Sequence, residues 1–125
     1  MGVTVLIVDD SAVMRKILER SLRQTQVAID TVLEAADGVE ALDRLQSANG
    51  VNVIFTDVNM PNMDGLEFLR QVRQSTKYGK VPVVMVTTEG AEAKVNEAMG
   101  LGAAGYIKKP FTPVQMQEAL QKIVS

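Results

Sequence analysis

Short apolar runs rich in β-branched residues alternate along this chain with segments that carry apolar residues at helical spacing. The clearest runs are Val3 to Val8, Val53 to Thr56 and Val83 to Val86. Such runs are typical of strands buried on both faces, which occur in parallel sheets that helices cover. Because strand and helix signals alternate five times, the sequence predicts an α/β fold, a five-stranded parallel sheet with helices on both faces.

The other segments of this alternation are less regular. Thr31 to Ala35 is more polar, so we expect a strand at an edge of the sheet, and a last strand is predicted around Tyr106 and Ile107. The helix predicted after the first strand has two faces. Its apolar residues, expected to face the sheet, are Val13, Ile17, Leu18 and Leu22. Its charged residues, expected to face away, are Arg15, Lys16, Glu19 and Arg23.

Composition limits the chemistry that this chain can perform. With 125 residues, 46% of them hydrophobic, the chain builds one core, and we expect a single domain over residues 1–125. The formal charge of -2 gives no support for a nucleic-acid partner. Cys and His are absent, which excludes disulfides, thiol nucleophiles, cysteine zinc sites and imidazole bases.

The sequence contains no targeting or membrane signal that we recognise. No stretch approaches the ~20 apolar residues needed to span a bilayer. The start, MGVTVLIVDD, lacks a basic region and runs into two aspartates, unlike a signal peptide. Leu6 stands where a myristoylation signal needs Ser or Thr. We therefore expect a cytoplasmic protein with no membrane partner.

Polar side chains gather where the predicted strands end. In chain order they are Asp9, Asp10, Asp57, Thr87, Thr88 and Lys109. Each also has a local explanation, because Asp10 or Ser11 could cap the first helix, Thr88 could cap the fourth, and Lys109 could be a solvated loop charge. Taken together, they would meet at one rim of the sheet, where open α/β sheets bind their ligands.

Three carboxylates in one crevice repel each other. At ~5 Å and an effective dielectric of ~20, each pair costs roughly 3 kcal/mol. Lys109 supplies one positive charge, and Mg²⁺, which prefers oxygen ligands and suits a shallow site, would supply two more. A nucleophilic carboxylate, a metal, an ammonium and a hydroxyl are the groups that phosphoryl transfer onto Asp requires.

Four stretches of the sequence resemble bacterial response-regulator receiver domains, and within that family the single-domain chemotaxis regulators. The stretches are VLIVDDS with Met14-Arg15, TDVNMPNMDGLEFL, VVMVTTEG and GYIKKPFTP. The resemblance covers nearly the whole chain, and DVNMPNMDG and KPF are highly specific in combination. It implies the flavodoxin-like (βα)5 fold with strand order 2-1-3-4-5, which would bring Asp9, Asp10 and Asp57 together.

The resemblance also implies a role for each site residue. Asp57 matches the phospho-acceptor, which takes a phosphoryl group from a histidine of a partner kinase. Asp10 and Asp57 match direct Mg²⁺ ligands, while Asp9 matches a ligand through water and Asn59 a ligand through its backbone carbonyl. Lys109 matches the lysine that pairs with the phosphoryl oxygens.

Other positions match the family's switch and the control of phosphoryl lifetime. Thr87 matches the hydroxyl that moves toward the phosphoryl group, and Tyr106 the aromatic that swings inward with it, although spacing alone favours a half-buried strand aromatic. Lys109-Pro110 matches a peptide bond that is cis in the family. The residues matched to control of the phosphoryl lifetime are Asn59, Thr88 and Glu89.

Two residues depart from the family pattern. Thr88 replaces a residue that is usually small, and its branched side chain could hinder attack by water or a phosphatase. Lys108 replaces a residue that is more often apolar. Strand alternation turns Lys108 and Lys109 to opposite faces, and Lys109 is favoured as the functional lysine because it directly precedes Pro110.

These matches predict a two-component response regulator that switches partner binding, not an enzyme acting on a separate substrate. The implied partners are a sensor histidine kinase as phosphodonor, the flagellar motor switch and a phosphatase, and we expect a monomer. The alternatives are a receiver excised from a longer regulator or a phosphate sink. A haloacid-dehalogenase-like phosphatase is less well supported, because Val58-Asn59 follows Asp57 and the second catalytic aspartate is missing.

Two other site types fail on particular residues. A calcium-binding EF-hand loop starting at Asp57 would need Gly and Glu where Asn62 and Phe68 stand. A flavodoxin-like electron carrier shares the fold, but Asp9-Asp10 would repel the flavin phosphate.

Overall fold

The computed structural model describes residues 2–88 and 92–124. The sheet has five parallel strands in the order β2-β1-β3-β4-β5. The strands are β1 (Val3–Val8), β2 (Ile29–Ala35), β3 (Val53–Asp57), β4 (Val83–Thr87) and β5 (Gly105–Lys108). The predicted α/β class and the strand order implied by the resemblance are both confirmed.

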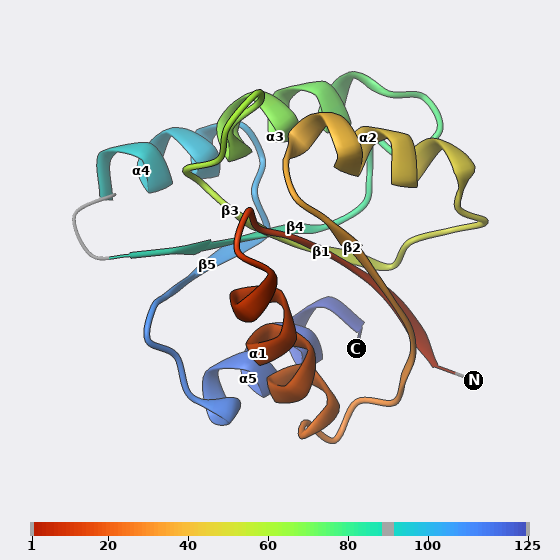
Figure 1. Ribbon diagram of the computed structural model, residues 1–125, viewed down its shortest axis with the longest axis vertical. Helices are drawn as coiled ribbons and strands as arrows, with labels where there is room; N and C mark the ends of the chain where they lie inside the picture. Colours follow the sequence, from red (N-terminus) through yellow and green to blue (C-terminus); the bar gives the residue numbers. More distant parts are fainter. Residues whose placement is uncertain (1, 89–91, 125) are drawn as a thin grey trace.

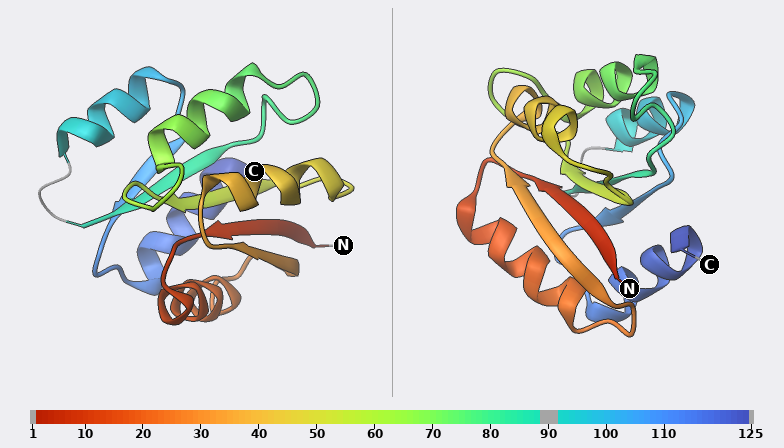
Figure 2. Two further views of the ribbon diagram at one scale, coloured as in Figure 1. Left: turned by 45° about the horizontal axis from the view of Figure 1, so that its top comes forward. Right: turned by 90° about the vertical axis from the view of Figure 1, so that its right-hand side faces the viewer.

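One helix follows each strand. The helices are α1 (Ala12–Arg23), α2 (Gly38–Ser47), α3 (Gly65–Gln74), α4 (Glu92–Gly100) and α5 (Pro113–Val124). The first and last helices, α1 and α5, lie side by side on one face of the sheet, and α2, α3 and α4 cover the other face (Figures 1 and 2). Among the described helices, none combines the length and the apolar character needed to cross a membrane.

Alternation along the strands divides the core into two layers. In β1, Val5 and Ile7 pack with the layer that contains Leu18 of α1, whereas Leu6 and Val8 pack with the layer beneath α2 and α3. Successive side chains of a strand point to opposite faces of the sheet. Since helices cover both faces, every position of β1 from Val5 to Val8 is fully buried, and these four positions are all apolar.

The buried face of α1 differs from the prediction. Leu18 and Leu22 are buried and Met14 packs against the same cluster, but Val13 is 72% exposed and Ile17 is 42% exposed. Residues four positions apart lie on one side of a helix, so the stripe of Met14, Leu18 and Leu22 sets the face that meets the sheet. The prediction that Val13 and Ile17 face the core was wrong.

The strand boundaries bring the functional residues onto the sheet. β2 begins at Ile29 rather than at Thr31, and it is an edge strand as expected. β3 and β4 each extend beyond their predicted ends, so Asp57 and Thr87 are the last residues of strands and not the first residues of loops. Their backbones are therefore fixed by the sheet, because Asp57 pairs with Val86 of β4 and Thr87 pairs with Lys108 of β5.

Candidate functional site

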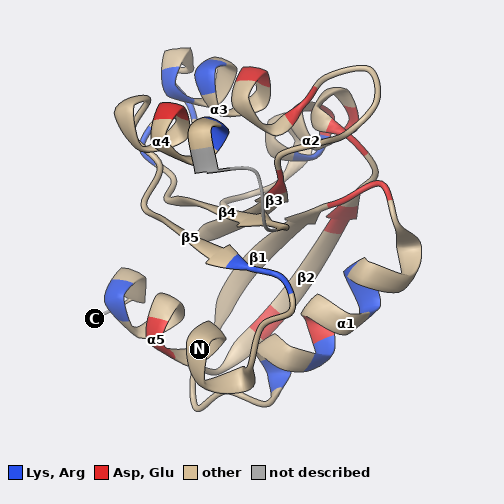
Figure 3. Ribbon diagram, turned by 90° about the vertical axis from the view of Figure 1, so that its left-hand side faces the viewer, with Lys and Arg blue, Asp and Glu red and all other residues tan. Residues whose placement is uncertain are grey.

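The predicted carboxylates meet at the carboxyl ends of β1 and β3. Asp9, Asp10 and Asp57 each offer a ligand oxygen, and these oxygens all lie within 4.8 Å of one another. Figure 3 looks toward this edge and shows acidic residues at the ends of β1 and β3 and basic residues at the end of β5. Because β1 pairs with β3, the segments that follow both strands share one rim. The predicted juxtaposition is confirmed.

Lys109 reaches this group from the far side of the sheet. Its Nζ lies 3.0 Å from Asp9 Oδ2 and 3.3 Å from Asp57 Oδ2. All three side chains are largely shielded from solvent, with exposed fractions of 13% for Lys109, 2% for Asp9 and 14% for Asp57. The Lys109-Pro110 peptide is cis, as the resemblance implied. Asp9, Asp10, Asp57 and Lys109 are called the site cluster below.

Negative charge is in excess in the site cluster. Burial raises the pKa of the Asp57 carboxyl; the charge of Lys109 works against that rise and the charge of Asp9 adds to it. Burial by itself lowers the pKa of Lys109, but hydrogen bonds and the charges of Asp9 and Asp57 leave it raised. One charged ammonium therefore pairs with Asp9 and Asp57 in a group of three carboxylates.

The local backbone fixes the orientation of Asp57. Its Oδ1 accepts a hydrogen bond of 2.7 Å from the backbone N–H of Val58, and its carbonyl accepts one of 3.0 Å from the Thr56 hydroxyl. The start of α3 packs directly against this backbone, since a Cβ at Gly65 would stand 2.2 Å from the Asp57 carbonyl oxygen. Gly65 is needed for this close approach. Gly65 stands within the segment TDVNMPNMDGLEFL, but no residue pattern in the sequence indicates this close contact.

The residues present fit a hard divalent cation such as Mg²⁺. The donors are oxygens, and the cluster has more carboxylates than cations. Asp10 is exposed, and no donor within residues 2–88 and 92–124 hydrogen-bonds its carboxylate. Of the two residues predicted as possible caps of α1, Ser11 is the cap, since its hydroxyl accepts from the Met14 backbone N–H, and Asp10 is not. Asp10 is thus available to a ligand.

Asn59, the other predicted ligand, lies just beyond β3. Its side chain is already engaged, because Oδ1 accepts a hydrogen bond of 3.0 Å from Lys94 Nζ of α4. The predicted contribution of Asn59 is through its backbone carbonyl, so this contact does not conflict with it. Lys94 itself was not singled out from the sequence, because nothing in its spacing connects α4 with the β3–α3 segment.

Arg15 is placed differently from the prediction. It was expected on the solvent side of α1, yet only 18% of its side chain is exposed. Its Nη1 donates to the backbone carbonyl of Asp9 at 2.6 Å, and its Nε donates to Glu34 Oε1 at 2.9 Å. Glu34 also pairs with Lys16 at 3.1 Å. Helical spacing cannot show such a contact, because Glu34 belongs to β2 and reaches α1 only in the folded sheet.

The residues matched to the switch lie on neighbouring strands. Thr87 ends β4 and is 1% exposed, and its hydroxyl donates a 3.3 Å hydrogen bond to the Thr88 carbonyl. Tyr106 lies on β5 and is 49% exposed. Thr88 is exposed. Glu89 lies outside the described residues.

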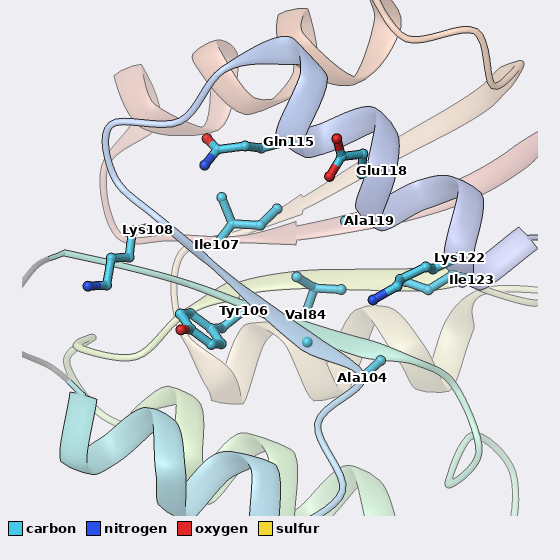
Figure 4. A pocket seen from close by; sticks show the side chains of 11 residues that line it. Val84, Ala104, Tyr106, Ile107, Lys108, Gln115, Glu118, Ala119, Lys122 and Ile123 are labelled. Atoms are coloured by element: carbon cyan, nitrogen blue, oxygen red, sulfur yellow. The ribbon is translucent and has the colours of Figure 1, made fainter.

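A separate pocket of about 530 Å³ lies between β5 and α5. Figure 4 shows Ile107 pointing toward α5, with Gln115 and Glu118 on that helix. Tyr106 and Lys108 also line the pocket, and no member of the site cluster does. The molecule thus has an acidic site at the strand ends and an open surface along its edge strand.

Comparison with known proteins identifies the family. Residues 5–121 match the model of the response regulator receiver domain. The chain belongs to the response regulator receiver domain family. A chemotaxis protein CheY homolog from Campylobacter jejuni is 47% identical to this receiver domain over 119 residues, which are 95% of this chain and 90% of that protein.

Other relatives agree with this membership. Chemotaxis protein CheY1 of Helicobacter pylori is 40% identical to this receiver domain over 95% of this chain and 94% of that protein. The solved structure of the chemotaxis response regulator CheY4 of Vibrio cholerae superimposes with a TM-score of 0.83 at 39% identity, covering 99% of this chain and 100% of that one. The chain is thus a CheY-type receiver domain of two-component signalling, and the resemblance seen in the sequence is confirmed.

Proposed function

We propose that this receiver domain accepts a phosphoryl group on Asp57 from a phosphohistidine of a sensor kinase and thereby changes which partner it binds in chemotaxis. The observation that supports this most is the position of Lys109, whose Nζ lies 3.3 Å from Asp57 Oδ2 and 3.0 Å from Asp9 Oδ2. An ammonium held beside a carboxylate can neutralise phosphoryl oxygens without reorganising during the reaction.

In the proposed reaction, a carboxylate oxygen of Asp57 attacks phosphorus. The new O–P bond forms as the P–N bond to the donor imidazole breaks, and the imidazole nitrogen keeps the electron pair of that bond. The Val58 N–H holds Asp57 Oδ1, so the other oxygen, Oδ2, is the one that lies toward Lys109. Positioning and charge neutralisation dominate catalysis in phosphoryl transfer, and this chain supplies both at Asp57.

The cofactor that we propose is Mg²⁺. Asp9, Asp10, Asp57 and the backbone carbonyl of Asn59 are the groups that would hold it, with Asp9 acting through water. When bound, the ion would neutralise charge on the phosphoryl oxygens and on the crowded carboxylates. Asp10 supports Mg²⁺ binding, because no described residue donates a hydrogen bond to its carboxylate and its oxygens are available to a metal.

The proposed switch runs from Thr87 to Tyr106. The Thr87 hydroxyl makes one long hydrogen bond, so it can be redirected to a phosphoryl oxygen on Asp57 at little cost. The space vacated by Thr87 then admits the exposed ring of Tyr106. The phosphoryl group shifts the balance between two conformations only as far as its contacts differ between them.

Three residues are proposed to set the lifetime of the phosphorylated form: Asn59, Thr88 and Glu89. The bulk of Thr88 beside Asp57 is expected to slow attack by water or by a phosphatase. The side chain of Asn59 accepts a hydrogen bond from Lys94 of α4. Replacing Thr88 by Ala therefore tests the effect of bulk alone.

The output that we propose is binding to the flagellar motor switch. Its basis is the chemotaxis names of the relatives and the open surface beside Tyr106. A sensor histidine kinase as donor, a phosphatase, a monomeric state, a cytoplasmic location and a single receiver domain over residues 1–125 all stay predictions. A phosphate sink would share the site cluster but would not need the surface near Tyr106.

The first experiment tests phosphorylation. The purified protein is incubated with acetyl phosphate and Mg²⁺, and phosphorylated protein is counted by intact mass spectrometry. We expect one added phosphoryl group in the wild type and in the control Asp30→Asn, whose exposed carboxylate lies on β2, and none in Asp57→Asn. Undiminished labelling of Asp57→Asn would place the acceptor elsewhere and contradict the proposal.

The second experiment tests the output. Beryllofluoride imitates a phosphoryl group on Asp, so immobilised protein with and without it is offered a purified motor switch protein. We expect binding to increase with beryllofluoride in the wild type and not in Asp57→Asn. Equal binding in both states would favour the phosphate sink.

A further inference from the structure

Arg15 links three parts of the structure at the edge of the site cluster. From α1 its guanidinium donates to Glu34 of β2 at 2.9 Å and to the backbone carbonyl of Asp9 at 2.6 Å. The side chain is 18% exposed, so both contacts are partly shielded from water. A planar guanidinium can make two such directed contacts at once, whereas the ammonium of a lysine is a point charge on a flexible stem.

The carbonyl that Arg15 contacts belongs to the peptide that joins Asp9 to Asp10. Asp9 is held on several sides, because its backbone N–H donates to Ala35 and its carboxylate accepts from the Ser11 N–H and from Lys109. Asp10 differs, since no described residue donates a hydrogen bond to its carboxylate. The direction of the Asp10 side chain therefore depends on the orientation of the peptide that precedes it.

We propose that Arg15 is a positioning residue that orients the Asp9–Asp10 peptide and so aims the Asp10 carboxylate into the site cluster. This inference rests on the proposed function, in which Asp10 is a Mg²⁺ ligand. Glu34 orients the guanidinium, and the guanidinium orients the peptide. Residues that orient metal ligands in this way commonly change metal affinity by 10–100-fold when they are replaced.

Charge alone gives the opposite expectation, which makes the proposal testable. A cation near a magnesium site repels the ion, so a residue that acted only through its charge would weaken Mg²⁺ binding, and its removal would tighten it. Arg15→Gln should therefore bind Mg²⁺ more tightly if charge is all that matters, and more weakly if orientation of the peptide matters more. Arg15→Lys keeps the charge and loses the two directed contacts.

The test measures the Mg²⁺ dissociation constant by titration calorimetry on folded, unphosphorylated protein, well below the melting temperature of each variant. We expect about tenfold weaker binding in Arg15→Lys and also weaker binding in Arg15→Gln. The matched control is Lys16→Gln, which removes a cation from the same Glu34 without touching Asp9. We expect Lys16→Gln to stay within about twofold of the wild type.

A second readout needs no metal. In protein free of Mg²⁺, the Ser11 amide hydrogen, which bonds to Asp9 Oδ1, should exchange with solvent several-fold faster in Arg15→Lys and unchanged in Lys16→Gln. An Arg15→Lys protein that melts earlier but keeps both the wild-type Mg²⁺ constant and the wild-type exchange rate would overturn the proposal. Tighter Mg²⁺ binding by Arg15→Gln would overturn it as well.

If the Arg15 variants fail to fold, Glu34→Gln leaves Arg15 in place but removes the carboxylate that orients it. Its control is Glu19→Gln, which removes the carboxylate of α1 that also pairs with Lys16. We expect weaker Mg²⁺ binding by Glu34→Gln than by Glu19→Gln, and equal binding would overturn the inference. A wild type that binds no Mg²⁺ would instead contradict the metal site of the proposed function, and the inference would fall with it.

Discussion

Two neighbouring ion clusters in this molecule have similar contact lengths and opposite charge balance. In the site cluster, Lys109 lies 3.0 and 3.3 Å from two of three carboxylates. In the second, called the Glu34 cluster, Glu34 lies 2.9 Å from Arg15 and 3.1 Å from Lys16. Burial raises the pKa of Asp57, and the net shift remains upward. Burial also acts to raise the pKa of Glu34, but hydrogen bonds from Arg15 and Lys16 lower it overall.

The difference shows that the ratio of charges, more than the contact distance, separates a reactive ion cluster from a structural one. The Glu34 cluster contains its own neutralising charge and holds α1 against β2. The site cluster has only the charge of Lys109 against three carboxylates. Perturbed ionisable groups in a shared crevice are what a functional site displays. We expect a bound cation to stabilise the carboxylates that Lys109 leaves unneutralised.

The largest expected contrast between the clusters is in the rate of phosphorylation. Lys109→Gln should slow the phosphorylation of Asp57 by acetyl phosphate about a hundredfold, because removing a preorganised charge from a transition state commonly costs 10²–10³ in rate. Lys16→Gln, which removes a cation from the Glu34 cluster, should stay within about twofold of the wild type. The measurement is a time course of phosphorylated protein by intact mass spectrometry. Equal slowing of both variants would contradict the different roles that we give the two clusters.

Removing one carboxylate from each cluster should change stability in opposite directions. Without Mg²⁺, Asp57→Asn should raise the free energy of unfolding by roughly 1 kcal/mol, because it relieves repulsion from Asp9 and Asp10 while Lys109 keeps its pair with Asp9. Glu34→Gln should lower it by about 0.5 kcal/mol.

Urea unfolding of both variants at neutral pH measures the two changes. A less stable Asp57→Asn would mean that the pairing of Asp57 with Lys109 outweighs the repulsion among the carboxylates. The charge ratio would then not be what distinguishes the site cluster.

Mg²⁺ should stabilise the folded protein through the site cluster and not through the Glu34 cluster. By mass action, Mg²⁺ at ten times its dissociation constant raises the free energy of unfolding by about 1.4 kcal/mol. Asp10→Asn should lose most of this gain, since Asp10 is a proposed ligand, while Lys16→Gln, which removes a cation from the Glu34 cluster, should keep most of it. Melting curves with millimolar MgCl₂, matched in ionic strength with NaCl, test this, and a melting temperature unmoved by Mg²⁺ in the wild type would contradict the site.

Most of the fold was predictable because it depends on local pattern. The apolar, β-branched run Val3–Val8 indicated a strand covered on both faces, and the structure buries Val5 to Val8 completely. The prediction failed in α1, where two apolar stripes could each face the sheet. Val13 and Ile17 fit an apolar stripe in the sequence, but the sheet accepts only one stripe, and Met14 lies on the one that it accepts.

The site was predictable where strand ends determine position, and unpredictable where contacts cross the fold. Asp9, Asp57 and Lys109 follow or end strands whose carboxyl ends share a rim, so their meeting follows from topology. The contact of Arg15 with Asp9 depends on how α1 is rotated against the sheet. The close approach at Gly65 depends on backbone distances that no residue pattern encodes.

The smallest expected effect concerns pH and the Glu34 cluster alone. The pKa of Glu34 lies below its ordinary value of 4.5 in the folded protein. A carboxyl group with a lowered folded pKa stabilises the fold while it is ionised, so its contribution is complete above the unfolded pKa and disappears as pH falls through the folded pKa. The difference in unfolding free energy between the wild type and Glu34→Gln should therefore stay constant from about pH 7 to about pH 5 and close below about pH 4.

The difference should remain below about 1 kcal/mol and shrink in high salt, because the cluster lies near the surface. Urea unfolding of both proteins across this pH range measures it, with Glu40→Gln, an exposed carboxylate of α2, as the control. A difference that grows as pH falls would mean that Glu34 is held as the neutral acid. The Glu34 cluster would then share the charge frustration of the site cluster, and the contrast between the two clusters would disappear.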